Sequence, residues 1–287
     1  MGDLAARCLR HAPAVGASPT AVEGLSVYRV DATSEPAHAV YERSIFLVVQ
    51  GRKQARVGDD VFAYDPDHYL VTSVPLPVTT QILEASAERP FLSLVVDIEL
   101  DVVRQIMARA GDVLWPTARS GPQRGLVARP VTPAIRGVVK RLVDLLDHPD
   151  DAPVLGPLYL RELLYHVLKG PHGGFLCAVA MGRGEQRSIA EVLAVVHADC
   201  TVELSVGEMA GMAGMSESVF YEAFKAVTAA TPKQYVKRLR LQEAHRQLTS
   251  GLANVSGAAH AVGYNSLSQF SREFTRLFGA NPSTLLG

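Results

Sequence analysis

The residues of this chain best suited to binding another molecule lie between regularly spaced phenylalanines near the C-terminus. Phe270, Phe274 and Phe278 recur every four residues, so they fall along one stripe of a helix and can anchor it to a core. The side chains between them project the other way and are small hydroxyls and arginines: Ser268, Ser271, Arg272, Thr275 and Arg276. Such an outer face suits the major groove of DNA, where these groups can bond to base edges. An ordinary amphipathic helix would show the same pattern, so this segment alone leaves both interpretations open.

The first half of the chain lacks the residue spacing of a catalytic site. A metal-dependent cupin enzyme needs two histidines one residue apart, then a carboxylate and a third histidine. His38 and His68 instead stand alone, and no Gly-x-Ser-x-Gly or Ser-x-x-Lys motif occurs in this half. We therefore expect no catalytic residue, no metal and no cofactor. A cupin-type enzyme with an appended DNA-binding domain is the alternative hypothesis.

Composition is typical of a soluble globular protein of two domains. The chain has 287 residues, of which 48% are hydrophobic and 20% charged, and its net charge is −1. No run of eighteen apolar residues occurs, so we expect no membrane span, and the first residues are too interrupted by charge for a signal peptide. Cys8, Cys177 and Cys200 lie far apart, which fits the reduced cytoplasm, and Cys8 is expected to be the most exposed. From Ser216 onward eight lysines and arginines face four acids, a net charge of +4 where a DNA-contacting surface would need it.

Short runs rich in valine, isoleucine, tyrosine and threonine predict strands in the first hundred residues. Breaks such as Pro75-Leu76-Pro77 separate seven candidates, at 25–32, 44–51, 53–58, 60–66, 68–74, 79–86 and 91–98. This spacing predicts an antiparallel sandwich or jelly-roll barrel, large enough to enclose one small ligand. Candidate ligand contacts at inward strand positions are Phe46, Val48, Tyr64, Tyr69, Thr72 and Gln81. Each of them could equally be plain core.

Two amphipathic helical patterns follow the strands. One runs from Ile135 to Leu146 and the other from Leu160 to Leu168, with a proline-rich connection at 148–157, so an antiparallel pair is expected. The pair could close the barrel, form a dimer interface, or do both. The glycine-bearing, charged segment 181–186 then indicates a domain boundary.

The last third of the chain contains an internal duplication. Ser205 and Glu208 form a capping box, Gly214 permits a tight turn, and Ser216 caps a following helix that carries Phe220. The same arrangement recurs later, where Ala259 lies four residues before Gly263 and phenylalanines again lie four apart. Equivalent phenylalanines are separated by 50 residues in both pairs, Phe220 with Phe270 and Phe224 with Phe274. Two helix–turn–helix units are predicted, and the repeat favours the DNA-binding interpretation.

A single helix is predicted between the two units. Thr231 caps it, Pro232 occupies its first turn and Gly251 ends it. Roughly 18 residues at about 1.5 Å each span about 27 Å. Successive major-groove segments on one face of DNA are about 34 Å apart, so this connector could hold two reading helices on one duplex.

The duplicated region resembles the DNA-binding domain of the AraC/XylS family of transcription regulators. The resemblance is carried by AGMSESVFYEAFKAVTAATPKQYVKRLRLQEAHRQL (213–248) and AVGYNSLSQFSREFTRLFGANPSTLL (261–286). The first half is similar to an AraC-type N-terminal domain, in IFLVVQGRKQARVG (45–58), YDPDHYLVTSVPLPVTTQILEAS (64–86) and PVLGPLYLRELLYHVLKG (153–170).

The resemblance implies an α+β protein that regulates transcription. It implies a leader at 1–20, a cupin-like effector-binding and dimerisation domain at 21–180, a linker at 181–187 and a DNA-binding domain at 188–287. The expected partners are double-stranded promoter DNA, a small-molecule effector, a second copy in a homodimer, and RNA polymerase if the protein is an activator. The expected location is cytoplasmic.

The resemblance also assigns DNA contacts by position. The first recognition helix would present Ser218, Tyr221 and Glu222, with Lys225 also on its exposed face. The second would present Leu267, Ser268, Ser271 and Arg272, with Arg276 on the same face. Glu222 departs from the family, which usually has a basic or neutral residue there. Its carboxylate could accept a bond from cytosine, or it could weaken the first helix and leave the second dominant; we favour the second interpretation.

Overall fold

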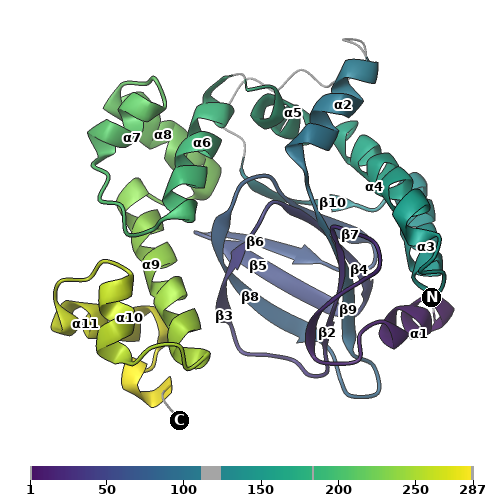
Figure 1. The fold of residues 1–287 in the computed structure, drawn as a ribbon, viewed down its shortest axis with the longest axis horizontal. Coiled ribbons are helices and arrows are strands. Elements are labelled where there is room, and N and C mark those ends of the chain that lie inside the picture. The colour runs from purple at the N-terminus through teal and green to yellow at the C-terminus, as the bar shows by residue number, and fades with distance from the viewer. Residues whose placement is uncertain (1, 111–123, 183, 286–287) are drawn as a thin grey trace.

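The protein is an α+β structure of two bodies placed side by side. The computed structural model describes residues 2–110, 124–182 and 184–285. Figure 1 shows a β-barrel covered on one side by helices, with a group of small helices against its other side. This confirms the predicted fold class, an antiparallel β-domain followed by an all-helical domain.

The barrel consists of two antiparallel sheets that face each other. The six-stranded sheet has the order β1 (Gly16–Pro19), β2 (Leu25–Val30), β9 (Phe91–Asp97), β4 (Ser44–Gln50), β7 (His68–Thr72) and β10 (Leu126–Pro130). The four-stranded sheet has the order β3 (Ala37–Tyr41), β8 (Leu76–Glu84), β5 (Arg52–Val57) and β6 (Asp60–Tyr64). Side chains alternate across each strand. In β4, for example, Phe46 and Val48 join the core inside the barrel, while Ile45, Leu47 and Val49 join the core beneath the helices.

All seven predicted strands are present, and three further strands were not predicted. β1 is only four residues long, β3 is largely exposed or half-buried, and β10 lies beyond a helix, so none shows a buried alternating run. Pro75-Leu76-Pro77 was predicted to be a break, yet β8 begins at Leu76 and Pro77 is paired with Val40. Proline lacks only the amide hydrogen, and a strand tolerates it near an end.

In the described part of the chain, the barrel side has five helices: α1 (Gly2–Arg10), α2 (Leu100–Ala110), α3 (Pro133–Leu146), α4 (Ala152–Leu168) and α5 (Gly173–Met181). α3 and α4 are the predicted pair, and they pack over the outer face of the six-stranded sheet (Figure 1). α4 begins inside the segment predicted to connect them, with Pro153 in its first turn. The residues predicted to form a leader contain α1 and β1. The expectation that Cys8 is the most exposed cysteine is wrong, because Cys8 lies on the buried face of α1 and is 0% exposed.

The C-terminal body has six α-helices and a short final turn in its described residues. They are α6 (Gly184–Ala198), α7 (Val206–Met212), α8 (Glu217–Thr228), α9 (Pro232–Thr249), α10 (Val255–Ala261), α11 (Leu267–Phe278) and η1 (Pro282–Leu285). α5 ends at Gly182 in the left-handed conformation, and α6 begins two residues later. The segment predicted to be a linker therefore includes the start of α6.

One hydrophobic core runs from the barrel interior into the helical body. It joins Phe46 and Val78 of the barrel to Phe220, Phe224 and Leu239 of α8 and α9. At this junction the hydroxyl of Tyr235 donates a hydrogen bond of 2.8 Å to the carbonyl oxygen of Pro75, and Tyr235 is fully buried. The first helix–turn–helix unit is thus packed against the barrel through a continuous apolar contact.

Candidate nucleic-acid interface and ligand-binding residues

The first helix–turn–helix unit consists of α7 and α8. Ser205 and Glu208 form the predicted capping box at the start of α7, and Ser216 accepts from the amide of Val219 at the start of α8. Gly214 in the turn has φ +66°, a left-handed conformation that glycine adopts without a steric clash because it has no Cβ. Phe220 and Phe224 are buried beneath α8 and hold it by its apolar side.

The second unit repeats this geometry in α10 and α11. Asn254 and Ser266 cap the two helices, and Gly263 has φ +84° in the turn between them. The rings of Phe270 and Phe274 have centroids 5.4 Å apart and an interplanar angle of 48°, against 5.4 Å and 50° for Phe220 and Phe224. The duplication predicted from spacing is therefore confirmed in the packing of the side chains.

Both units leave the predicted reading faces open to solvent. On α8 the exposed residues include Ser218, Tyr221, Glu222 and Lys225, and on α11 they include Leu267, Ser268, Arg272 and Arg276. Ser271 is half-buried. Leu267 is 47% exposed and Tyr221 37% exposed, although both carry large apolar groups. The structure therefore groups the predicted DNA contacts on two exposed helical faces; which of them touch bases stays a prediction.

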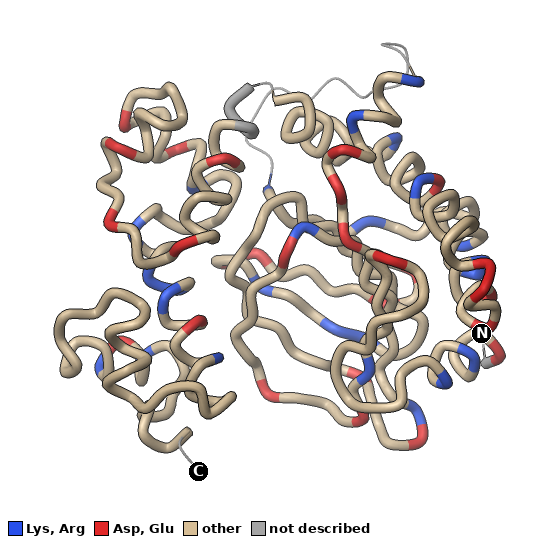
Figure 2. The backbone as a smooth tube through the Cα atoms, viewed as in Figure 1, with Lys and Arg blue, Asp and Glu red and all other residues tan. Residues whose placement is uncertain are grey.

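The positively charged residues near these faces favour the binding of a polyanion by the second unit. Arg272 and Arg276 form no ion pair or hydrogen bond with another described residue. The lysines and arginines of α9 add further positive charge between the two units (Figure 2). Long-range attraction of phosphate by such cations supplies much of the affinity of DNA-binding proteins.

Partly buried hydrogen bonds and an ion pair join α11 to α9. Glu273 accepts from the hydroxyl of Tyr264 at 2.8 Å and pairs with Lys237 at 3.1 Å. Burial raises the pKa of Glu273, but the bonds from Tyr264, Lys237 and Gln269 outweigh it and hold this pKa below its ordinary value. Glu273 thus stays charged and fixes the orientation of the second reading helix.

A barrel residue next to α8 was missed by the sequence analysis. Arg124, just before β10, donates to the carbonyl oxygens of Lys225 and Ala226 and pairs with Asp60 of β6 at 2.6 Å. It lines a shallow cavity together with Ser218 and Glu222. No motif surrounds Arg124 in the sequence, so only the fold reveals this contact.

The predicted effector-binding residues divide between the two faces of the sheets. Phe46, Val48 and Tyr64 belong to the core inside the barrel, and Thr72 shares the face of its neighbour Leu70, which lies in that core. The expectation that Tyr69 faces inward is wrong, because it packs in the core beneath the helices. The expectation that Gln81 faces inward is also wrong.

Gln81 lies on the outer side of the four-stranded sheet. Its neighbour Ile82 joins the inner core, whereas Gln81 accepts a hydrogen bond of 2.8 Å from Gln54 on the adjacent strand. Both corrections have one physical cause: successive side chains of a strand point to opposite faces, and the sequence alone did not fix which set faced in.

Lys53 is an inward residue that the sequence analysis missed. It lies on the same side of β5 as Ala55 and Val57 and is only 8% exposed. Its ammonium lies 4.8 Å from the ring centroid of Tyr28 and 5.5 Å from that of Tyr41. Burial lowers the pKa of Lys53 to about 8. The alternation K-x-A-x-V in β5 was the available signal, hidden because a lysine is expected to face solvent.

Other aromatic and hydroxyl groups lie on the inner faces of the same barrel. The Tyr41 ring stacks on Phe46 with centroids 4.5 Å apart, and the hydroxyls of Tyr41 and Tyr64 lie 2.7 Å from each other. The Thr72 hydroxyl is buried without a hydrogen-bond partner among the described residues. Among the residues that the structure describes, no cluster of histidine, cysteine and carboxylate side chains could hold a metal ion. No helix in this part of the chain has the length and apolar character needed to cross a membrane.

Two family models match the chain. The AraC-type transcriptional regulator N-terminus matches residues 21–175, and a helix-turn-helix domain matches residues 209–287. The first of these matches alone covers more than half of the chain. Together they cover the strands from β2 to β10, the helical pair and nearly all of the two helix–turn–helix units.

Relatives and solved structures match over nearly the whole length. The HTH-type transcriptional regulator ExsA of Pseudomonas aeruginosa is 24% identical over 244 residues, covering 84% of this chain and 85% of ExsA. The virulence regulon transcriptional activator VirF of Yersinia enterocolitica is 21% identical over 252 residues, covering 86% and 91%. The structure of ToxT from Vibrio cholerae aligns with a TM-score of 0.56 at 11% identity, covering 91% of this chain and 97% of ToxT. The two chains share the same two-body fold.

Proposed function

The chain belongs to the AraC family of DNA-binding transcriptional regulators, and from this premise we propose that a small organic anion bound inside its barrel controls promoter binding by α8 and α11. The family is one of transcription regulators rather than enzymes, so the alternative of a cupin-type enzyme is set aside. Promoter DNA is the partner of the helical body, and the ligand is the partner of the barrel.

The observation that carries the ligand proposal is the buried ammonium of Lys53. The ammonium lies over the rings of Tyr28 and Tyr41, and Lys53 forms no ion pair or hydrogen bond with another described residue. A buried cation without an opposite charge is costly, and an anionic group would offset that cost. The unpartnered Thr72 hydroxyl offers a further polar contact on the inner face. An apolar body of the ligand would lie against Phe46 and its neighbours.

The shared core gives such a ligand a route to the DNA-binding helices. Phe46 and Val48 lie in the same apolar cluster as Phe220 and Phe224, which support α8. A ligand that repacks the inner barrel would change how firmly the first helix–turn–helix unit is held. Because interiors are close-packed, small shifts at one side of such a core are transmitted to the other.

A relative offers a parallel for the ligand class. One ToxT structure from Vibrio cholerae, with a TM-score of 0.51 and 13% identity to this chain, contains a bound unsaturated fatty acid. A fatty acid has an anionic head and an apolar chain, the two properties that Lys53 and the aromatic lining would select here.

We also propose a homodimer formed through α4. Val154 and Leu158 lie one turn apart on this helix and are 68% and 56% exposed. A second copy of the chain would cover them, and two copies would contact two promoter sites. Sedimentation of the full chain would show a dimer, and Val154→Asp with Leu158→Asp would return it to a monomer; a monomeric wild type would refute this part.

The test begins with selection of DNA from a random-sequence pool by the full chain. The expected result is one enriched sequence with two subsites, and Arg272→Ala should enrich it with a relaxed preference at one base pair. Binding of that sequence is then titrated in the presence of a panel of organic carboxylates and their neutral alcohol analogues. We expect a carboxylate, but not its alcohol, to change the Kd for DNA.

Lys53→Met, which keeps the length and apolar body of the side chain, should abolish that response while DNA binding without ligand persists. Lys169→Met, which removes an exposed lysine of the helical layer, is the matched control and should respond like the wild type. A carboxylate response that survives Lys53→Met would refute the assignment of the site. Failure to enrich any sequence would refute promoter binding itself.

A further inference from the structure

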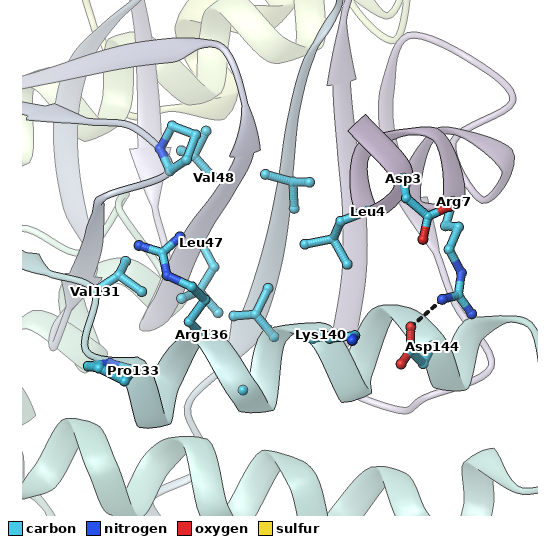
Figure 3. A pocket seen from close by; sticks show the side chains of 14 residues that line it. Asp3, Leu4, Arg7, Leu47, Val48, Val131, Pro133, Arg136, Lys140 and Asp144 are labelled. Atoms are coloured by element: carbon cyan, nitrogen blue, oxygen red, sulfur yellow. Dashed lines mark ion pairs between the residues drawn. The ribbon is translucent and has the colours of Figure 1, made fainter. Parts of the chain in front are cut away.

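A cavity lies outside the barrel, between α1, α3 and the outer side of β4. Its volume is about 670 Å³, which falls within the range of small-molecule sites. Figure 3 shows side chains from all three elements converging on it. Its apolar surface is formed by Leu4, Leu47, Val49, Val131, Pro133 and Val139. Val48 lines this groove and also belongs to the inner core, but Lys53, Tyr28 and Tyr41 do not line it, so the groove is separate from the site around Lys53.

Gly137 keeps the groove open on the α3 side. A methyl group added to Gly137 would meet only the guanidinium of Arg141, at 3.7 Å, so close packing does not exclude a larger residue there. Glycine in the middle of a helix is destabilising relative to alanine. Gly137 therefore destabilises α3, and it lies at a position where a larger side chain would occupy part of the groove.

The rim of the groove carries one cation that the protein does not neutralise. Arg7 pairs with Asp144 at 2.5 Å and Arg136 pairs with Asp67 at 2.9 Å. Lys140, one turn after Arg136 on α3, forms no ion pair or hydrogen bond with another described residue. Asp3 is the remaining acid of the lining, and in Figure 3 it lies beside Arg7 at the far end from Arg136.

α1 forms the third wall, and its buried Ala5 and Cys8 and a cluster of ion pairs at the end of α3 hold it in place. Arg7, Arg10 and His11 all bond to the carboxylate of Asp147 at the end of α3, at 3.1, 2.8 and 3.0 Å. The bonds from His11, Arg10 and Arg7 hold the pKa of Asp147 well below its ordinary value. The carboxylate stays charged, so α1 remains in place while the groove beside it is open to solvent.

We propose that this groove is a second ligand site, for an amphipathic anion whose apolar body lies between α1, β4 and α3 and whose carboxylate pairs with Lys140. The apolar surface matches a short hydrocarbon or aromatic body, and Lys140 supplies the charge for its head group. A ligand bound here would add a second site to the proposed control of DNA binding, because only the strand β4 lies between this groove and the inner core. Its existence does not depend on the barrel site or on DNA binding.

The experiment uses decanoate as the probe and the full chain as the protein. Binding is measured by isothermal titration calorimetry and by the shift in Tm, beside 1-decanol and decylamine as neutral and cationic probes of equal length. We expect saturable binding of decanoate, at least tenfold weaker binding of decanol, and none of decylamine. In a Lys53→Met background, which removes the proposed barrel site, Gly137→Leu should abolish binding by filling the groove, and Lys140→Glu should weaken it at least tenfold.

Three variants separate this site from the alternatives. Gly137→Ala is the folding control, because alanine favours the helix and leaves most of the groove open, so it should retain binding. Lys169→Glu should bind like the wild type, since it changes an equal charge elsewhere on the helical layer. Lys53→Met should also retain binding. The proposal is overturned if decanoate binding is lost in Lys53→Met and kept in Gly137→Leu, or if decanol and decanoate bind equally.

Discussion

The guanidinium of Arg124 donates a hydrogen bond of 2.9 Å to the carbonyl oxygen of Ala226, in the last turn of α8. A second bond of 3.1 Å reaches the carbonyl of Lys225. The last carbonyls of a helix lack partners within it and form the negative end of its dipole. A cation from the barrel therefore caps the first reading helix of the other body, and the two bodies are joined by this contact as well as by their shared core.

Arg124→Ala should loosen this junction. The lost charge-assisted bonds are expected to lower the free energy of unfolding by about 1–3 kcal/mol. Thermal melts of the full chain would measure the change, and limited proteolysis would show faster cleavage between the bodies. Arg52→Ala, at an exposed arginine of β5, is the control and should leave both readouts unchanged. Equal melting curves for the two variants would contradict the capping role.

Arg272→Ala should weaken binding to the selected DNA. Arg272 is exposed on α11 and is free of ion pairs with other described residues, so its guanidinium is available to a base edge. The expected cost is about 1–3 kcal/mol, with relaxed preference at one base pair. A gel-shift titration measures this cost. Arg89→Ala, in the loop before β9, should bind like the wild type; unchanged affinity in Arg272→Ala would exclude the assigned contact.

Glu222→Ala should change base preference rather than merely strengthen binding. The Glu222 carboxylate is exposed on α8, where it would repel phosphate but accept from a cytosine amino group. Repeating the site selection with the variant should alter the subsite read by α8 and leave the subsite of Arg272 as it was. Identical selected sequences would show that Glu222 reads no base.

The contact between Glu42 and His197 should make the junction pH-dependent. His197 Nε2 lies 2.7 Å from Glu42 Oε1, and this bond raises the pKa of His197 above 6.5 and lowers that of Glu42 below 4.5. The stabilisation from His197 is complete below its unfolded pKa of 6.5 and is lost as the pH rises through the raised folded value. The stabilisation from Glu42 is lost only when the pH falls through its lowered folded pKa.

The difference in Tm between the wild type and Glu42→Gln isolates this pair. It should be largest below the unfolded pKa of His197 and shrink as the pH rises through the raised folded pKa, where the imidazole loses its proton. His38 and His245 have lowered pKa values, chiefly from burial, and their opposite contribution is common to both proteins and cancels in the difference. A difference that grows with pH would contradict the assignment.

Gly58→Ala should disturb the same junction sterically. A methyl group on Gly58 would lie 2.9 Å from the Cβ of Ala229, and Gly58 has φ +61°, which L residues rarely adopt. The expected loss is about 1–3 kcal/mol of unfolding free energy, measured by chemical denaturation. Adding Ala229→Gly removes the contact with the Ala229 Cβ, but the carbonyl oxygen of residue 229 stays 3.0 Å from the added methyl group and the backbone strain at Gly58 remains, so the double variant should recover only part of the loss. Full recovery would show that Gly58 is needed for space alone.

Sequence patterns predicted most of the secondary structure and the two reading faces. The phenylalanine pairs, the capping box and Gly214 with Gly263 are local signals, and each is confirmed by the packing or the backbone. Local signals succeed in such units because cap, turn and core lie within about twenty residues of one another.

The parts that the sequence did not predict depend on long-range placement. Tyr69 and Lys53 were misassigned or missed because alternation separates two faces without saying which one becomes the interior. Arg124 contacts residues about a hundred positions later in the chain. α1 was taken for part of a leader because nothing within residues 1–20 shows the carboxylate of Asp147 to which it is fastened. These features arise from topology, which no short window contains.

The connector α9 has a consequence for the geometry of the promoter. Its 18 residues contain neither glycine nor an internal proline after Pro232, and it carries one helix–turn–helix unit at each end (Figure 1). Every added residue would turn the second unit by about 100° relative to the first and move it by about 1.5 Å. The angular phase between α8 and α11 is thus a property of the protein. A promoter with one extra base pair between its two subsites would present the second subsite about 34° out of phase, since DNA turns once in about 10.5 base pairs.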